Sequence, residues 1–348
     1  MTATPHPGPP ATPGALATAP DVITMGRSGV DIYPAQVGRR LEDVDSFVKF
    51  VGGSPTNVAV AAARLGRRVA LVTGVGDDPF GRYVLRELSA FGVDTSMIVT
   101  VGAAPTPVTF CEIFPPDDFP IYFHRHPAAP DLQIRPEDLD LGAIAGAGVF
   151  WISVTGLSAQ PSRSAHHAAL AARGRARFTV LDLDYRPTLW TSETDAIAEV
   201  QSVLGQVDVA VGNLEECRVA LGVDRAVGPH EAADGLLAAG VDLAVVKQGP
   251  AGVLAATATD RVQVPAFEVA VVNGLGAGDG FGGALCHGLL AGWPLAETIA
   301  FAGAAGAIVA GRLGCSVAMP TAAEVAAIRS GDRSVVPLDP AGLPTVTP

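Results

Sequence analysis

A glycine-rich stretch with one carboxylate is the segment of this chain best suited to chemistry. Residues 273–285 read NGLGAGDGFGGAL, and we expect them to follow a strand ending near Val272 and to open a helix that starts near Gly278. Backbone N–H groups at a helix start are unpaired, and glycines let an anion approach them, so the pattern predicts a phosphate site. Asp279 is electrostatically unfavourable beside an anion, unless it accepts a proton from a hydroxyl group that attacks the phosphorus. The alternative is a tight turn in which Asp279 only caps the helix.

Two other phosphate-binding motifs do not fit this stretch. A Walker loop requires Lys-Ser/Thr after its glycines, and none follows here. A dinucleotide fingerprint requires Gly-x-Gly-x-x-Gly after the first strand, where this chain reads MGRSGVD. The chemistry that the stretch favours is therefore phosphoryl transfer.

The segments that must position this stretch alternate between strand and helix patterns. We expect strands at 21–26, 68–76, 148–154, 178–183, 208–212 and 242–247, followed by a β-pair near 251–265. We expect helices at 54–66 (with Ser54 as N-cap), 78–92, 160–173, 192–205, 213–221 and 229–239, and two buried helices within 278–310. This alternation predicts an α/β fold with a mostly parallel central sheet and helices on both of its faces.

Two β excursions interrupt that alternation, at about 31–50 and 105–125. We expect them to form a small β lid over the carboxyl edge of the sheet, where ligands bind in such folds. The expected domain organisation is a disordered leader at 1–20, one large domain at 21–330 and a C-terminal tail at 331–348.

Composition excludes several classes of partner. The net charge is −12 and no Lys/Arg-rich block occurs, which argues against nucleic acid and against an anionic membrane. The N-terminus lacks the basic and apolar regions of a signal peptide, and the longest apolar part is interrupted by polar residues, so we expect a cytoplasmic protein without a membrane span. The four cysteines form no C-x-x-C pair and are expected to be buried, reduced thiols: Cys111, Cys217, Cys286 and Cys315.

Two segments together resemble the signatures of the PfkB family of sugar and nucleoside kinases, which have the ribokinase-like fold. NGLGAGDGF resembles the C-terminal signature and GGSPTNVAVAAARLG, at 52–66, the N-terminal one. Both occur once and in the family order, and the layout from about 21 to 330 is similar. The chain departs from the family pattern at Asn273, where the usual residue is Asp, so any help from that side chain must come from neutral hydrogen bonds.

The resemblance implies a role for each matching residue. Asp279 would be the catalytic base, and the backbone N–H groups of Gly276, Ala277 and Gly278 would surround the transferring phosphoryl group. The residues expected to hold sugar hydroxyls are Asp31, Gly52, Gly53 and Asn57. Taken singly, Asp31 and Asn57 are equally consistent with a turn acid and a helix-surface amide.

The nucleotide side of the site is implied by two further elements. GNLEEC, at 212–217, resembles the family's Asn-x-x-Glu element, in which Asn213 and Glu216 organise Mg²⁺ and its waters near ATP. Asn213 and Glu216 also fit a helix capping box, and both roles can coexist. VVKQGPAGV, at 245–253, resembles the strand and turn beside the nucleotide, which would place Lys247 and Gly249 near phosphates or ribose; a single Lys at a strand end is more often just solvated.

Two arginines favour a substrate that carries a carboxylate. Arg125 ends the second lid segment in IYFHRHP, and Arg186 lies in LDLDYRPTLW, which resembles an element of family members acting on keto-deoxy sugar acids. Arg186 also fits a structural ion pair with Asp182 or Asp184. Tyr122 and Phe123 are expected to shield the sugar from water.

The run FPPDDFPIYFHR, with the glycine stretch, resembles the family members of inositol catabolism. The implied reaction transfers the γ-phosphoryl group of ATP to the C6 hydroxyl of 5-dehydro-2-deoxy-D-gluconate. The alternatives are a 2-keto-3-deoxygluconate kinase or a ribokinase-type sugar kinase, and more distantly a sugar or nucleotide sensor without catalysis. The exposed edges of a β lid can also pair across a homodimer.

Overall fold

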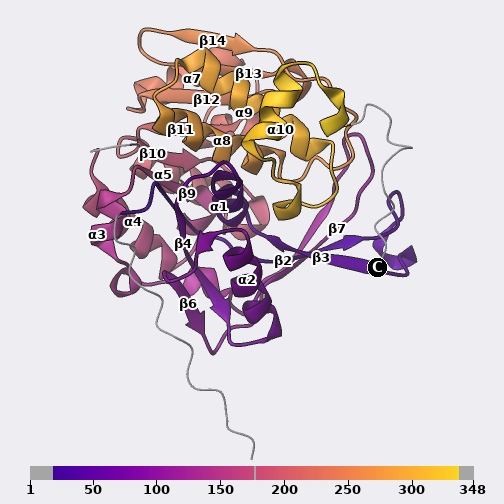
Figure 1. The fold of residues 1–348 in the computed structure, drawn as a ribbon. Helices are drawn as coiled ribbons and strands as arrows, with labels where there is room; N and C mark the ends of the chain where they lie inside the picture. Colours follow the sequence, from indigo (N-terminus) through magenta and orange to yellow (C-terminus); the bar gives the residue numbers. More distant parts are fainter. Residues whose placement is uncertain (1–18, 176–177, 337–348) are drawn as a thin grey trace, which may run out of the picture.

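The computed structural model describes residues 19–175 and 178–336, and these build a large sheet with a second, smaller sheet at one side (Figure 1). The large sheet has 10 strands in the described residues, with β14-β13-β12-β11-β10-β9-β1-β4-β5 in order and β6 paired to β4. The pairs among β12, β11, β10, β9, β1 and β4 are all parallel, whereas β13 and β14 run antiparallel at one edge. The strands are β1 (Val22–Met25), β4 (Val69–Gly76), β5 (Val93–Asp94), β6 (Ile98–Val101), β9 (Val149–Ser153), β10 (Phe178–Asp182), β11 (Val209–Asn213), β12 (Leu243–Lys247), β13 (Val253–Ala256) and β14 (Arg261–Val264).

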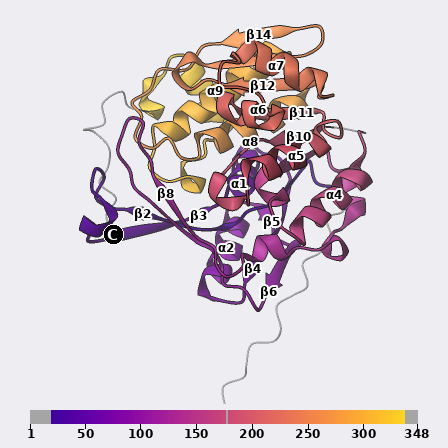
Figure 2. The same ribbon diagram turned by 180° about the vertical axis from the view of Figure 1, so that it is seen from behind.

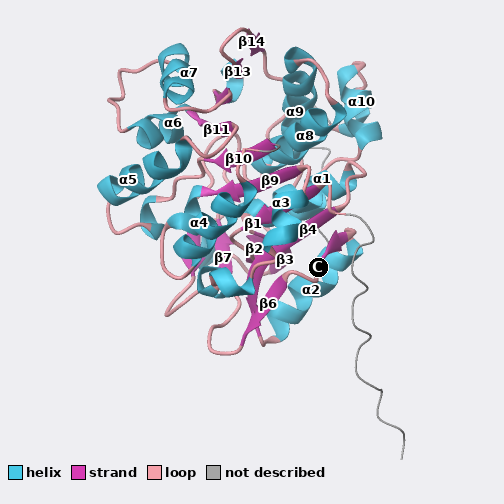
Figure 3. Ribbon diagram, turned by 90° about the vertical axis from the view of Figure 1, so that its left-hand side faces the viewer, coloured by secondary structure: helices cyan, strands magenta, loops and turns pink. Residues whose placement is uncertain are grey.

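Helices cover both faces of the large sheet, as Figure 3 shows edge-on. The first face packs against α1 (Ser54–Arg64), α2 (Pro79–Ala90), α8 (Ala277–Ala291), α9 (Leu295–Ala310) and α10 (Ala322–Arg329). The second face packs against α3 (Leu141–Gly146), α4 (Ser162–Arg173), α5 (Glu193–Leu204), α6 (Leu214–Leu221) and α7 (Pro229–Ala238). Each strand therefore lies between two apolar layers, which accounts for the nearly continuous Val, Ala and Leu content of the strand segments.

The smaller sheet is the expected lid, and it extends sideways from the body (Figures 1 and 2). Its strands are β2 (Gly29–Pro34), β3 (Phe47–Gly52), β7 (Val108–Cys111) and β8 (Ile121–His124), in the order β3-β2-β7-β8. Strand register decides which side chains share a face, because successive residues alternate between faces. Asp31 and Phe123 therefore lie on one face, which we call the inner face, and Tyr122 lies on the other.

The structure confirms the predicted α/β architecture and corrects two details of it. The expected strand ending near Val272 is absent, since no strand lies within residues 265–272. The N–H groups of Val272 and Asn273 instead donate to the carbonyl of Ala310, at the end of α9. The N-cap of α1 is Gly53, with φ of 104°, and not Ser54, whose hydroxyl bonds Asp182 instead. The short elements β5, β6, α3 and α10 were not predicted.

Other expectations concern the termini, the cysteines and the membrane. Residues 1–18 and 337–348 lie outside the described residues, and with them most of the expected leader and tail. All four cysteines are free and buried, as expected. Among the described residues, no helix combines the length and the apolar content that crossing a membrane requires.

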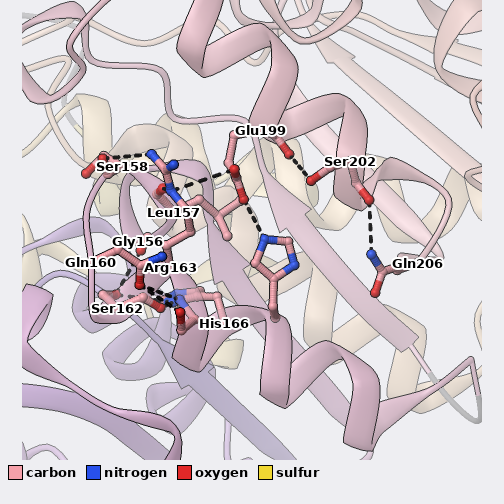
Figure 4. A network of polar contacts seen from close by, with 12 residues as sticks. Gly156, Leu157, Ser158, Gln160, Ser162, Arg163, His166, Glu199, Ser202 and Gln206 are labelled. Atoms are coloured by element: carbon pink, nitrogen blue, oxygen red, sulfur yellow. Dashed lines mark hydrogen bonds and ion pairs between the residues drawn. The ribbon is translucent and has the colours of Figure 1, made fainter.

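A polar network fixes the connection from β9 to α4 (Figure 4). Arg163 donates to the carbonyl oxygens of Leu157 and Ser158, at 2.7 and 3.2 Å, and so ties the start of α4 to the turn before it. His166 lies fully buried below this turn, its Nδ1 2.8 Å from the carbonyl oxygen of Ser162, and burial lowers the pKa of His166 to about 4. The imidazole is therefore neutral at physiological pH, and His166 adds no buried charge to this connection.

Glycines in α8 allow α1 to approach it closely. A Cβ built on Gly283 would lie 2.4 Å from the Cβ of Ala61 and 2.8 Å from the backbone nitrogen of Ala62. A Cβ on Gly282 would lie 2.6 Å from the ring of Trp151 in β9. The backbones of the two helices therefore come into close contact, and the ring of Trp151 packs against α8, which fixes the position of the α8 N-terminus relative to α1.

This contact generates a stability prediction. Gly283→Ala should lower the free energy of unfolding by about 1–3 kcal/mol, because the added methyl group overpacks the helix contact. Gly102→Ala is the matched control, since a Cβ there has no heavy atom within 4 Å, and it should leave stability unchanged or slightly raised. Urea unfolding followed by circular dichroism measures both variants. Equal stabilities would show that α1 and α8 are not in close contact.

Candidate active site

The candidate site lies at the carboxyl ends of the central parallel strands. Asp182 ends β10, Asn213 ends β11 and Lys247 ends β12, while Arg27 follows β1 after Gly26. Neighbouring parallel strands finish at the same edge, so residues from four distant parts of the chain meet there. The starts of α1 and α8 and the inner face of the small sheet close the site.

The glycine stretch forms the predicted anion site at the start of α8. Gly276 is the N-cap, with φ of 84°, a left-handed conformation that a side chain would strain. The first bond of the helix runs from the N–H of Gly280 to the carbonyl of Gly276, at 2.9 Å, so the N–H groups of residues 277–279 precede the helical ladder. Lys247 adds a positive charge, because a Cβ on Gly278 would lie 3.1 Å from its Nζ. The partial positive charges of these N–H groups and the full positive charge of Lys247 therefore lie close together at the start of α8.

Asp279 lies in the first turn of α8 and bonds to α1. The Nδ2 of Asn57 donates to the Oδ2 of Asp279 at 2.9 Å. Burial raises the pKa of Asp279 to about 6, against the bonds from Asn57 and Ser54, which stabilise the ionised form. The Oδ1 of Asn57 is buried and has no hydrogen-bond partner among the described residues. The asparagine thus orients the carboxylate and keeps an acceptor free for a hydroxyl group.

Asp31 comes to the site from the small sheet. A Cβ on Gly52 would lie 2.1 Å from its carboxylate, so glycine at 52 leaves room for this side chain. Burial raises the pKa of Asp31 to about 7. The positive charge of Arg27 opposes this shift, whereas the negative charge of Asp279 adds to it. Asp31 is therefore within electrostatic reach of both groups, and the N- and C-terminal motifs meet in one site.

Asp182 and Lys247 form a second acid–base group. The hydroxyl of Ser54 donates to Asp182 at 3.1 Å. Burial raises the pKa of Asp182 to about 7, although Lys247 counteracts it. Burial would lower the pKa of Lys247, but Asp182 and Glu216 outweigh it and hold that pKa above its ordinary value. Lys247 is therefore charged and surrounded by carboxylates, so it is not the solvated strand-end lysine that was the alternative.

A third group joins Arg27, Asp184 and Arg186. Asp184 accepts from Arg27 at 3.1 Å and lies 2.6 Å from the Nη2 of Arg186. Burial would raise the pKa of Asp184, but the two guanidinium groups outweigh it and hold the pKa below its ordinary value. The ion pair between Arg186 and Asp184, one of the alternatives from the sequence, is thus present.

Asn213 and Glu216 form the capping box of α6. The N–H of Asn213 donates to Glu216 at 2.7 Å, and the N–H of Glu216 donates to the side chain of Asn213 at 2.9 Å. Within the described residues, no group of three or more His, Cys, Asp or Glu side chains could enclose a metal ion. A protein that offers one or two carboxylates fits Mg²⁺, which keeps several waters and binds largely through substrate phosphates.

Three other expected residues lie apart from this cluster. Arg125 forms a buried ion pair with Asp131, at 2.7 Å. Tyr122 is 45% exposed on the outer face of the small sheet and donates to Glu112 at 3.3 Å. Gly249 begins a short 3-10 turn after β12, with φ of 56°. The inner-face aromatic residue beside the cluster is Phe123, whose ring centroid lies 5.2 Å from the guanidinium carbon of Arg27.

Comparison with known proteins now identifies the family. The model of the pfkB family of carbohydrate kinases matches residues 19–322. The chain belongs to the PfkB family. It is 33% identical over 311 residues to the 5-dehydro-2-deoxygluconokinase of Shouchella clausii (strain KSM-K16), covering 88% of this chain and 95% of that one. This PfkB kinase is therefore an ATP-dependent phosphotransferase that acts on an alcohol group of a sugar.

Two solved structures show the same fold as this PfkB kinase. A PfkB protein from Polaromonas sp. JS666 superposes with a TM-score of 0.75 at 27% identity, covering 86% of this chain and 98% of that one. A fructokinase from Xylella fastidiosa with bound ATP gives a TM-score of 0.78 at 26% identity, covering 90% of this chain and 99% of that one. The large sheet and the small lid sheet are thus a ribokinase-like fold.

For four residues of the candidate site in this PfkB kinase, the sequence analysis predicted either no role or only a structural one. Arg27 was not singled out, Ser54 was expected only as a helix N-cap, and Asp182 and Asp184 were considered only as partners of Arg186. Arg27 follows β1 after Gly26 and Asp182 ends β10, so each stands where ligands bind in an open parallel sheet. Their position at the end of a predicted strand was the sequence signal that could have identified them.

Proposed function

We propose that this kinase phosphorylates the C6 hydroxyl of 5-dehydro-2-deoxy-D-gluconate, in the degradation of inositol. Two relatives named 5-dehydro-2-deoxygluconokinase support this substrate. They are 33% identical in Shouchella clausii and 34% identical in Geobacillus kaustophilus, and each is matched over about nine-tenths of its length. The observation that carries the proposed chemistry is the buried contact between Asn57 and Asp279 at the start of α8. It places one oriented carboxylate beside a group of unpaired backbone N–H donors.

In the proposed mechanism, Asp279 is the general base. Its carboxylate accepts the proton of the C6 hydroxyl as that oxygen attacks the γ-phosphorus of ATP, and the bond from this phosphorus to the bridging oxygen of ADP breaks. Asn57 orients the carboxylate and, with Asp31, holds sugar hydroxyls against the backbone of Gly52 and Gly53. Phosphoryl transfer has a loose transition state, so positioning matters more than the strength of the base.

The start of α8 would stabilise the charge on the transferring group. The N–H groups of Ala277 and Gly278, behind the turn at Gly276, point to where the equatorial oxygens would lie, and Lys247 adds a full charge beside them. Asn213 and Glu216 would hold Mg²⁺ through its waters, with Gly249 near the nucleotide. Mg²⁺ held there would neutralise charge on the phosphates.

The first test compares substrates in the wild type and in Asp279→Ala. We expect the wild type to phosphorylate 5-dehydro-2-deoxygluconate with a higher kcat/KM than 2-keto-3-deoxygluconate or ribose. Asp279→Ala should reduce kcat by about 10²–10⁴-fold, the usual contribution of a general base. The exposed carboxylate of Asp260, in the turn between β13 and β14, provides the control Asp260→Ala, which should keep full activity. Undiminished turnover in a folded Asp279→Ala protein would exclude the proposed base.

The pH dependence of kcat/KM tests the same role independently. Because the pKa of Asp279 is about 6, the base is protonated and inactive at lower pH, so activity should rise as the pH increases through about 6. Asn57→Leu removes a donor that stabilises the ionised carboxylate, so the midpoint should move to higher pH by about one unit, as expected for a hydrogen bond to a charged group. A midpoint that does not move would assign this titration to Asp31 or Asp182.

The outer face of the small sheet supports a second proposal, that a second copy of this chain binds there. Phe47, Phe110 and His124 make edge-to-face ring contacts across three strands, at 5.9 and 5.4 Å between centroids, and Phe47 is 42% exposed. β3 and β8 also form the two edges of this sheet. An apolar face with open edges fits a symmetric contact between identical sheets.

Sedimentation velocity tests this contact. The wild type should sediment as a dimer, and Phe47→Glu should shift it to the monomer, because the new charge would be buried between the two sheets. Phe80→Glu alters a phenylalanine of similar exposure at the start of α2, on the body of the protein, and should leave the dimer intact. A wild-type chain that sediments as a monomer at all concentrations would contradict the proposal.

A further inference from the structure

Asp184 holds two arginines side by side at the edge of the site. Its Oδ2 accepts from Arg27 and its Oδ1 lies 2.6 Å from Arg186, so the two guanidinium groups share one carboxylate. Arg27 follows β1, whereas Asp184 and Arg186 follow β10. These strands are separated in the sheet only by β9, so the group spans the centre of the carboxyl edge.

Both guanidinium groups keep a donor unused. The Nε of Arg27 and the Nε of Arg186 are buried and have no hydrogen-bond partner within residues 19–175 and 178–336. Arg27 as a whole is 9% exposed, and a buried N–H without an acceptor costs free energy. A partner that brings acceptor oxygens to this place would satisfy these donors.

The charge of the group matches one carboxylate. Two arginines and one aspartate give +2 − 1 = +1. A monocarboxylate brings −1 and pairs with this charge, whereas a neutral sugar leaves the buried Nε donors of Arg27 and Arg186 without a charged acceptor. Guanidinium groups also offer the planar pair of donors that a carboxylate accepts.

Arg27 lies where a sugar would extend from Asp279. Its charge acts on both Asp31 and Asp279, so it is within electrostatic reach of the hydroxyl-binding and catalytic carboxylates. Its guanidinium also stacks on Phe123 of the inner face of the lid, at 5.2 Å. Arg125, the lid arginine expected from the sequence, is instead neutralised by Asp131 in a buried ion pair.

We propose that Arg27 is a specificity-determining residue, which binds the carboxylate of the sugar acid together with Arg186 while Asp184 holds the two guanidinium groups in place. This inference rests on the proposed function, because it assumes an acidic sugar. Asp184 sets the positions of the arginines, and Phe123 stacks on the guanidinium of Arg27 from the lid. Rejection of neutral sugars then follows from buried guanidinium donors left without a charged acceptor, in addition to any difference in shape.

The decisive experiment is binding without turnover. Isothermal titration should compare D-gluconate, a six-carbon acid, with D-glucitol, its neutral counterpart of equal length. Arg27→Met should weaken D-gluconate binding by about 10–100-fold, the range for a lost bond to a charged group, and change D-glucitol binding by less than about threefold. Arg27→Lys should lie between wild type and Arg27→Met, because lysine keeps the charge but loses the planar pair of donors.

Two controls separate this role from a structural one. Arg27→Met leaves Asp184 paired with Arg186, so its urea midpoint and its KM for ATP should stay close to the wild-type values. Arg86→Met removes an exposed arginine of α2 and should bind D-gluconate as the wild type does. An equal loss of D-gluconate and D-glucitol binding in Arg27→Met would overturn the inference, and so would a wild type that prefers D-glucitol.

Turnover distinguishes this inference from the proposed function. If the wild type binds D-gluconate through Arg27 but does not phosphorylate 5-dehydro-2-deoxygluconate, the carboxylate site stands and the substrate is a different sugar acid. If it phosphorylates that substrate and Arg27→Met leaves its KM unchanged, the proposed function stands and the inference about Arg27 is wrong.

Discussion

The close approach of α1 and α8 is the constraint on which the rest of the site depends. Without a side chain at Gly283, the backbones of the two helices come within contact distance at Ala61. Only this spacing brings Asn57, in the first turn of α1, within 2.9 Å of Asp279, in the first turn of α8. The same contact brings the unpaired N–H groups at the start of α8 close to the turn at Gly53. The packing of α1 against α8 and the geometry of the candidate site therefore depend on the same contact.

Burial of charge is the second constraint, and the site meets it by pairing. Five carboxylates and three cations gather at one edge of the sheet: Asp31, Asp182, Asp184, Asp279 and Glu216, with Arg27, Arg186 and Lys247. The carboxylate that touches two arginines, Asp184, is ionised, whereas burial raises the pKa of the less well-compensated Asp31 and Asp182 to about 7. Each acid therefore takes its protonation state from its own neighbours, which lets one site hold a base and several hydrogen-bonding carboxyl groups.

Much of the fold follows from local sequence patterns, and the site only in part. Buried strands and amphipathic helices were predictable because period and capping are local properties, and Asp279 and Asn57 lie in recognisable motifs. Arg27 and Asp184 were not predicted as partners, because β1 and β10 become near neighbours only through the strand order. Tyr122 and Phe123 were both expected to shield the sugar, but adjacent residues of a strand point to opposite faces of the sheet, so only Phe123 shares the face of Asp31.

Asn273 lies between the small sheet and the glycine-rich loop, and its contacts with both decide which side chain fits at this position. It is completely buried, its Oδ1 accepts from the N–H of Leu275 at 3.0 Å, and its Nδ2 faces the hydroxyl of Tyr33 at 3.4 Å. Tyr33 belongs to β2 and also contacts Cys315, the residue packed against Gly276. An aspartate at 273 would bury a negative charge close to a phosphate site and would lose the N–H donors of the amide. A neutral amide therefore fits this position, and it links the lid strand to the glycine-rich loop at the start of α8.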